Sequence, residues 1–280
     1  MMILWLKPPK LREVSKYIAC YWFLEKKTDA TGDDYPKLNP DPSAHLILSL
    51  PSQTYQYQRN NEISQGKGSH FLSPYCKTLQ LDHSKPLACL GIKFHVGALY
   101  SLKKLNFPTD LLDIINEINF DDIKGDAQVN EKELLANAKL APDKCCDMLD
   151  KLFMPLLLSS HEDKHSEITR QILPLLENKA INEIGETLFC SQRTVERSFL
   201  RVTGLTLKQC QSMNKLEAIL EFLYQREQSV LDWVDIAYQF GFSDQPHLIR
   251  YLKGQIGLTP KDYTLQRGFT IDVYGGVDSK

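Results

Sequence analysis

The hydrophobic pattern of the chain changes near residue 100. Before that point, short apolar runs with a period of two are separated by Pro, Gly and Asn, which predicts strands of a mostly antiparallel sheet. We expect those strands over residues 45–50, 54–58, 77–81 and 91–96. After that point the period lengthens and turn residues become rare. This predicts helices over residues 110–118, 131–140 and 143–158.

A polar stretch over residues 159–166 interrupts the apolar pattern, and almost everything beyond it has helical periodicity. A chain of 280 residues has room for two domains. We therefore predict a sensing or dimerising domain (1–158), a linker (159–166), a DNA-binding domain (167–267) and a tail (268–280). The expected fold class is α+β: a mostly antiparallel β domain with helices, for which a barrel-like form is one option, followed by an all-α tandem helix-turn-helix domain.

Two segments of the second domain share one pattern, which is the mark of an internal repeat. They are IGETLFCS (184–191) and IAYQFGFS (236–243). In each, Gly185 or Ala237 is small enough for a second helix to cross closely. Ser191 or Ser243 is placed to cap that second helix. These are the requirements of a helix-turn-helix unit.

The turns of the two segments differ in one residue. Gly241 suits the positive φ that a tight turn often demands, whereas Phe189 takes that place in the first copy. We therefore expect a distorted first turn. Asp232 and Asp235 have the spacing of a capping box at the start of the second unit. Apolar residues at helical spacing predict a helix that connects the units: Leu207, Cys210, Met213, Leu216, Leu220 and Leu223.

Each Ser is followed by an amphipathic helix. Its apolar positions are four apart, Val195 with Phe199 and Leu248 with Leu252, so one face is directed to a core. The other face carries side chains that read base edges or bind phosphate. The predicted DNA-binding residues are Gln192, Arg193, Glu196, Arg197, Arg201, Gln245, His247, Arg250 and Lys253.

The overall charge gives little support to nucleic-acid binding, because the net charge is −2. Its distribution is more informative. Basic residues dominate residues 193–215 and 245–267, while acidic residues collect between these stretches and before them. This sorting suits two basic helices on a neutral scaffold.

Four motifs resemble the signature of the AraC/XylS family of bacterial regulators: SQRTVERSF (191–199), TGLT (203–206), IAYQFGFSDQ (236–245) and GLTPKDY (257–263). The resemblance implies two helix-turn-helix units on a long helix, which insert recognition helices into successive major-groove faces. The resemblance implies that the following residues, which stand at matching positions, contact DNA: Arg193, Glu196, Arg197, Gln245, His247 and Arg250. Leu207, Cys210 and Pro246 depart from the family pattern, but a first helical turn tolerates Pro.

The resemblance also implies an N-terminal sensing or dimerising domain, and GIKFHVGA (91–98) is similar to a strand-then-helix stretch of some members. The partners expected on this interpretation are double-stranded promoter or operator DNA, RNA polymerase, a small-molecule effector and a second copy of the chain. No cofactor and no metal are expected. No apolar run approaches the roughly 18 residues of a membrane helix, which favours a cytoplasmic protein. The resemblance implies that this protein is a bacterial transcription factor.

Two other function classes stay open. Residues 161–165 read H-E-x-x-H, the zinc-protease signature, which would make the chain a zinc metalloenzyme using His161, Glu162 and His165. The polar flanks favour a solvated linker instead. A protein-interaction module that has lost DNA affinity is the other alternative.

The remaining histidines and cysteines have patterns typical of structural residues rather than of functional ones. His45, His70, His83 and His95 fall in the predicted sheet without H-x-H spacing, which is typical of structural histidines. The seven cysteines have no C-x-x-C spacing, and Cys145 with Cys146 fits apolar filling. The sequence has no G-x-S-x-G, P-loop or G-x-G-x-x-G motif, so we expect no enzymatic activity.

Overall fold

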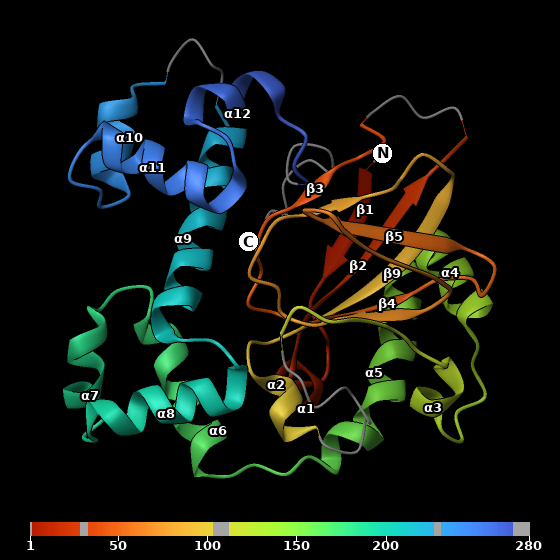
Figure 1. The fold of residues 1–280 in the computed structure, drawn as a ribbon. Coiled ribbons are helices and arrows are strands. Elements are labelled where there is room, and N and C mark those ends of the chain that lie inside the picture. Colours follow the sequence, from red (N-terminus) through yellow and green to blue (C-terminus); the bar gives the residue numbers. More distant parts are fainter. Residues whose placement is uncertain (1, 29–32, 103–111, 227–230, 271–280) are drawn as a thin grey trace.

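Two antiparallel sheets form the N-terminal region of the computed structural model, which describes residues 2–28, 33–102, 112–226 and 231–270 (Figure 1). The larger sheet contains, in spatial order, β1 (Met2–Lys7), β2 (Ile18–Lys26), β9 (Leu87–Phe94), β4 (His45–Leu48), β7 (His70–Leu72) and β10 (Ile115–Glu117). The smaller sheet contains β3 (Lys37–Leu38), β8 (Leu79–Leu81), β5 (Thr54–Arg59) and β6 (Glu62–Lys67). All four predicted strands are therefore present.

The helix predicted over residues 110–118 is wrong in its described part. Ile115–Glu117 forms β10, which pairs antiparallel with β7. The backbone N–H of Ile114 also donates to Ser73 Oγ at 2.7 Å. These partners lie about forty residues away in the sequence, and such non-local pairing overrides a weak local period. Residues 110 and 111 lie outside the described residues.

Helices cover one face of the larger sheet (Figure 1). The helices of this region are α1 (Arg12–Ser15), α2 (Ala98–Ser101), α3 (Phe120–Lys124), α4 (Glu131–Leu140) and α5 (Pro142–Leu158). Phe94 of β9 packs edge to face against Phe153 of α5, with ring centroids 6.5 Å apart. The helices predicted over 131–140 and 143–158 are confirmed. Cys145 and Cys146 are fully buried in this core, so their predicted role as apolar filling is also confirmed.

The C-terminal region is all helical within the described residues. It contains α6 (Lys164–Ile172), two short 3-10 turns (Leu173–Leu175 and Ile181–Glu183), α7 (Ile184–Thr187), α8 (Gln192–Thr203), α9 (Leu207–Tyr224), α10 (Trp233–Gln239), α11 (Gln245–Ile256) and α12 (Pro260–Gln266). The expected fold class, an α+β region followed by an all-α tandem helix-turn-helix region, is confirmed.

The long helix α9 joins the two helix-turn-helix units (Figure 1). The residues in its first half, such as Cys210 and Met213, belong to the core of the first unit. Residues of its second half, such as Leu216 and Leu223, belong to the core of the second unit. The predicted apolar stripe is buried throughout. A single rigid helix therefore sets the separation of the two units.

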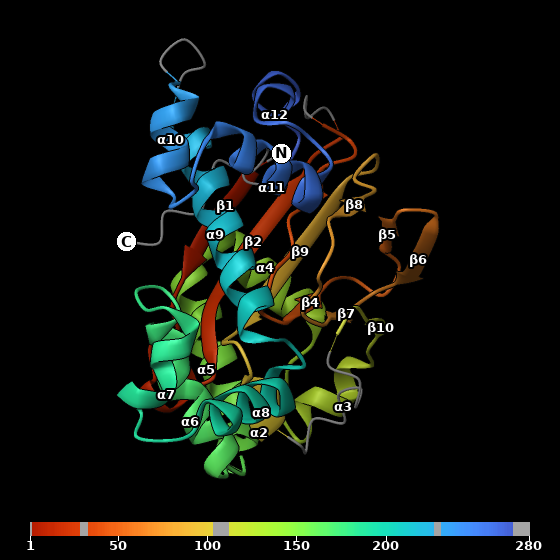
Figure 2. The same cartoon turned by 60° about the vertical axis from the view of Figure 1, so that its left-hand side comes forward.

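Helix α9 also lies beside the larger sheet, as Figures 1 and 2 both show. Lys93 of β9 forms an ion pair with Asp41 at 3.0 Å. Desolvation lowers the pKa of Lys93, but Asp41 and Glu217 of α9 outweigh it and raise that pKa. Charges on the sheet and on the connecting helix are thus close enough to interact.

Among the described residues, no helix combines the length and apolar character needed to cross a membrane.

Candidate nucleic-acid interface

The two turns of the tandem domain have the same hydrogen-bond pattern. In each, successive N–H groups donate to carbonyl oxygens three and five residues back. The bonds are Phe189 N to Glu186 O (3.2 Å), Cys190 N to Gly185 O (3.0 Å), Gly241 N to Tyr238 O (3.0 Å) and Phe242 N to Ala237 O (2.8 Å). The repeat found in the sequence is therefore a repeat of backbone geometry.

The small residue at the helix crossing is required by the close approach of the two helices in the first unit. A Cβ atom on Gly185 would lie 2.9 Å from the carbonyl oxygen of Cys190 and 3.1 Å from the backbone nitrogen of Gln192. Both are backbone atoms that cannot rotate away. Ala237, at the same place in the second unit, is fully buried. The predicted reason for the small residue is thus confirmed for Gly185.

The expected distortion of the first turn is wrong. Phe189 adopts φ of +51°, in the same left-handed region as Gly241 at +68°. The turn hydrogen bonds hold this conformation although a side chain makes it unfavourable, by about 1–2 kcal/mol. The Phe189 side chain is 98% exposed. The first unit therefore keeps the regular turn and carries a protruding aromatic ring beside its recognition helix.

The caps of the two recognition helices differ. Ser191 caps α8 as predicted, since its Oγ accepts from the N–H of Thr194 at 3.1 Å. The prediction for Ser243 is wrong, because Asp244 caps α11 by accepting from the N–H of His247 at 2.7 Å. The second unit has one more residue between its turn and its helix. The signal for this cap was Asp244 followed by Pro246, a first-turn residue, two positions later.

The predicted apolar stripes of both recognition helices are confirmed, since Val195, Phe199, Leu248 and Leu252 are fully buried. The opposite faces carry the predicted DNA-binding residues. Exposed members of this set are Arg193, Glu196, Arg197 and Arg201 on α8, and His247, Arg250 and Lys253 on α11. Gln192 and Gln245, at the first position of each helix, are half-buried.

Four of these residues have side-chain partners within the chain, and one of them is His247, whose Nδ1 lies 3.2 Å from Ser243 Oγ. Gln192 Nε2 donates to Glu196 Oε1 at 3.1 Å, so the amide and the carboxylate form one polar unit on the face of α8. Arg201 Nε donates to the hydroxyl oxygen of Tyr100, in α2 of the N-terminal region, at 3.0 Å. Sequence reasoning missed Tyr100, because no local pattern joins residues 101 positions apart.

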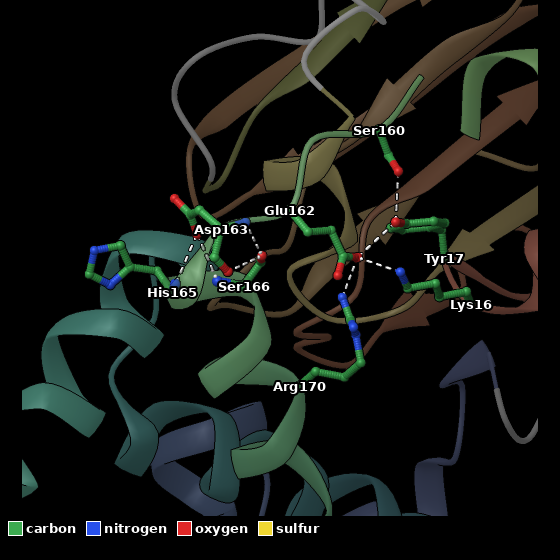
Figure 3. Close-up of polar contacts among 8 residues, drawn as sticks. All are labelled: Lys16, Tyr17, Ser160, Glu162, Asp163, His165, Ser166 and Arg170. Atoms are coloured by element: carbon green, nitrogen blue, oxygen red, sulfur yellow. Dashed lines mark hydrogen bonds and ion pairs between the residues drawn. The ribbon is translucent and has the colours of Figure 1, made fainter. Parts of the chain in front are cut away.

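The H-E-x-x-H segment does not have the geometry of a zinc site. Its two histidines would need to share one face of one helix, but α6 begins at Lys164, after His161. The Glu162 carboxylate instead accepts hydrogen bonds from Tyr17 Oη at 2.7 Å and Lys16 Nζ at 3.0 Å, and binds Arg170 as well (Figure 3). Within the described part of the chain, no three His, Cys, Asp or Glu side chains are grouped to hold a metal ion.

The solvated-linker interpretation of this segment also needs correction, because the Glu162 side chain is only 16% exposed. Desolvation raises the pKa of this carboxyl, but the hydrogen bonds from Arg170, Tyr17 and Lys16 outweigh it and bring the pKa to about 2. Lys16 and Tyr17 come from the N-terminal region and Arg170 from α6 (Figure 3). Glu162 is therefore an ionised centre of the junction between the two regions.

The histidines predicted to lie in the sheet have separate surroundings, and two of them lie outside the strands, since His83 follows β8 and His95 follows β9. His45 Nε2 lies 3.1 Å from Asp41, and His95 Nε2 lies 3.1 Å from the carbonyl oxygen of Ser15. His70 lies between the hydroxyl of Tyr57 (2.7 Å) and the carbonyl of Gly68 (3.1 Å). These contacts support structural roles.

Comparison with known proteins finds two family models that match parts of the chain. Residues 184–266 match one described as a helix-turn-helix domain, and residues 8–110 match a domain of unknown function. No curated protein matches the sequence. These segments coincide with the tandem unit described above and with most of the sheet region.

Solved structures with similarity to this chain are remote. ToxT from Vibrio cholerae is 12% identical over 87% of this chain and 98% of its own, with a TM-score of 0.46. The C-terminal domain of AraT, a response regulator from Geobacillus stearothermophilus, is 19% identical over 38% of this chain and 84% of its own, with a TM-score of 0.30. The AraC-like transcriptional activator CuxR is 11% identical over 76% and 85%, with a TM-score of 0.24.

Proposed function

We propose that this chain, whose residues 184–266 match a helix-turn-helix domain, is a sequence-specific DNA-binding transcription regulator of the AraC/XylS type. One observation carries the proposal. Two recognition helices, α8 and α11, have the same turn and a buried stripe, and both expose arginine and other polar side chains. Solvation alone would not repeat this combination twice around one connecting helix.

The side chains on the two helices have distinct proposed roles. Arg193, Glu196 and Arg197 in the first unit, and Gln245, His247 and Arg250 in the second, contact base edges in the major groove. Arginine pairs with guanine, glutamine with adenine and glutamate with cytosine. Gln192 supports this contact through Glu196. Arg201 and Lys253 lie in the last turns of their helices and contact phosphate.

In this proposal the two units, joined by the connecting helix α9, contact successive major-groove segments of one DNA face. Such segments are about 34 Å apart, one turn of the duplex. The proposed partner is therefore promoter or operator DNA with two half-sites about 10 base pairs apart. RNA polymerase is a further proposed partner.

We further propose that the N-terminal domain senses a small molecule or forms a dimer, and passes this signal to both units. Its contacts with each unit support the proposal. Thr78 Oγ1 donates to Gln255 O of α11, in the second unit, at 3.4 Å, and Lys37 N donates to Gly268 O, just after α12, at 2.8 Å. On the first unit, Tyr100 binds Arg201. A shift of the sheet region would therefore act on both recognition helices.

Gel shift with promoter fragments from the neighbourhood of the gene tests the DNA-binding proposal. Replacement of Arg197 or Arg250 by alanine is expected to cost about 1–3 kcal/mol and to relax preference at particular bases. Lys132→Ala, which removes an exposed cation from α4, is the matched control and should leave binding unchanged. Uniform weakening across all sequences would assign these arginines to phosphate instead.

Salt dependence gives a second measure. If the basic faces of α8 and α11 neutralise phosphates, the logarithm of the binding constant falls linearly with the logarithm of salt concentration. A flat response, or no binding to any duplex at low salt, would contradict the proposal. The protein-interaction module would then be the better account, because the net charge is −2 and the Phe189 ring is exposed.

A further inference from the structure

Tyr100 of the N-terminal domain forms a fixed hydrogen-bond relay to the first recognition helix. Its hydroxyl oxygen lies 2.8 Å from Asp163 Oδ2 and 3.0 Å from Arg201 Nε. An ionised carboxylate can only accept and a guanidinium can only donate. The single hydroxyl proton of Tyr100 therefore goes to Asp163, and the hydroxyl lone pair accepts from Arg201. Every donor and acceptor in the relay has one possible role.

Asp163 is a rigid base for this relay. Its other carboxylate oxygen, Oδ1, caps α6 by accepting from the N–H groups of His165 at 2.9 Å and Ser166 at 3.0 Å (Figure 3). Ser166 Oγ in turn accepts from the N–H of Asp163 at 2.9 Å, which completes a capping box. One carboxylate therefore holds a helix end with one oxygen and Tyr100 with the other.

The helix that carries Tyr100 lies directly against the helix that carries Arg201. Gly97 precedes α2, and a Cβ atom there would lie 2.8 Å from Val202 Cγ1, so no side chain fits between them. The relay therefore spans a tightly packed contact. A movement of α2 relative to α8 would break the bond to Arg201.

Because the hydrogen bond to Tyr100 uses Nε, the two terminal Nη groups of Arg201 can bind phosphate. Among the residues that the structure describes, the bond to Tyr100 is the one side-chain hydrogen bond of Arg201. The two terminal Nη groups form the fork that binds phosphate oxygens. Because Tyr100 is neutral, it orients the guanidinium without cancelling its charge. A pre-oriented side chain loses less entropy when it binds.

We propose that Tyr100 is a positioning residue for DNA binding: it holds Arg201 in place for a phosphate contact and so links the affinity of the first unit to the position of the N-terminal domain. This inference rests on the proposed DNA-binding function. It adds a residue from outside the tandem domain to the DNA interface.

A double-mutant cycle on the full chain tests the proposal. The probe is a duplex of about 30 base pairs that the wild-type chain selects from a random pool, which accommodates two half-sites. Tyr100→Phe is expected to weaken binding about fivefold, the size of one net hydrogen bond. Arg201→Ala should weaken it at least as much and make the salt slope shallower by about one phosphate. The double variant should match Arg201→Ala alone.

Lys253→Ala is the matched control, because Lys253 lies in the last turn of the other recognition helix, away from Tyr100. Its effect should multiply with that of Tyr100→Phe, since the two sites share no partner. Arg201→Lys is a second variant that keeps the charge and loses the Nε donor. Because it also removes the Nη fork, it should weaken binding at least as much as Tyr100→Phe, and it leaves the N-terminal domain unaltered if Tyr100→Phe fails to fold.

Three results would overturn the inference alone while DNA binding stands. Tyr100→Phe, or Arg201→Lys in its place, could leave the affinity unchanged. The effects of Tyr100→Phe and Arg201→Ala could multiply. Tyr100→Phe could tighten binding, which would make the contact one that withholds Arg201 from DNA. Absence of DNA binding by the wild-type chain would overturn the proposed function and the inference with it.

Discussion

Phe189 and Gly241 hold the same place in the two helix-turn-helix turns, and both have a left-handed backbone. Glycine adopts this conformation readily, but a residue with a Cβ atom does so at a cost. The Phe189 ring is 98% exposed, so burial of the ring does not offset that cost. The first turn is regular because its hydrogen bonds impose the conformation on an unsuitable residue.

Phe189→Gly is therefore expected to stabilise the protein. The change removes the left-handed strain, which is worth about 1 kcal/mol after the extra backbone entropy of glycine in the unfolded chain is subtracted. Urea unfolding followed by circular dichroism measures the difference. Gly241→Ala introduces a side chain at the equivalent position of the second turn and should destabilise the protein by a similar amount. A less stable Phe189→Gly variant would mean that the aromatic ring makes contacts that offset the strain.

Gly185→Ala is expected to destabilise the first unit by about 1–3 kcal/mol, because the added methyl group would press on the backbone of residues 190 and 192. The matched control is Gly254→Ala in α11, where a Cβ atom meets nothing within 4 Å. That change should stabilise by about 0.5–1 kcal/mol, since alanine favours a helix interior. Thermal melting of both variants gives the comparison. Equal effects would mean that close helix crossing does not limit residue 185.

His70 should make the protein less stable in mild acid. Burial lowers the pKa of His70 to about 4, against an ordinary value of 6.5. The unfolded chain therefore binds more protons between these values, and stability falls as the pH drops from about 6.5 to 4. The loss approaches roughly 3 kcal/mol at the lower end.

Urea unfolding at several pH values checks this expectation. His70→Gln keeps a donor and an acceptor for Tyr57 and Gly68 but does not titrate. Its stability should be lower at pH 7 and should fall less between pH 6.5 and 4 than that of the wild type. Burial also lowers the pKa of His83 to about 4, and that contribution cancels in the comparison. Parallel curves would show that His70 is not the group that titrates.

Glu162→Gln should weaken the junction between the two regions. Lys16 and Arg170 would lose the carboxylate that neutralises them, at an expected cost of about 1–3 kcal/mol. Glu177→Gln, on the exposed surface after α6, is the control and should have almost no effect. Since the pKa of Glu162 is about 2 against an ordinary 4.5, the wild type should lose this contribution as the pH falls through that window. A difference that persists at the lowest pH would argue against the ion pairs.

The sequence by itself determined the features that depend on local periodicity and capping. The stripe of Val195 and Phe199, the cap at Ser191 and the buried face of α9 follow from a period of 3.6 and from side chains that reach their own backbone. The set of exposed residues on the two recognition helices follows from the same periodicity. Their roles in base reading stay predictions.

Only the tertiary structure decided the features that join distant segments. Residues 115–117 became a strand because β7 supplies their hydrogen-bond partners. Glu162 became a buried ionic centre because Lys16, Tyr17 and Arg170 converge on it. Tyr100 reached Arg201 because α2 packs against α8. A local sequence pattern cannot predict such partners, because their separation in the sequence bears no relation to their distance in the folded chain.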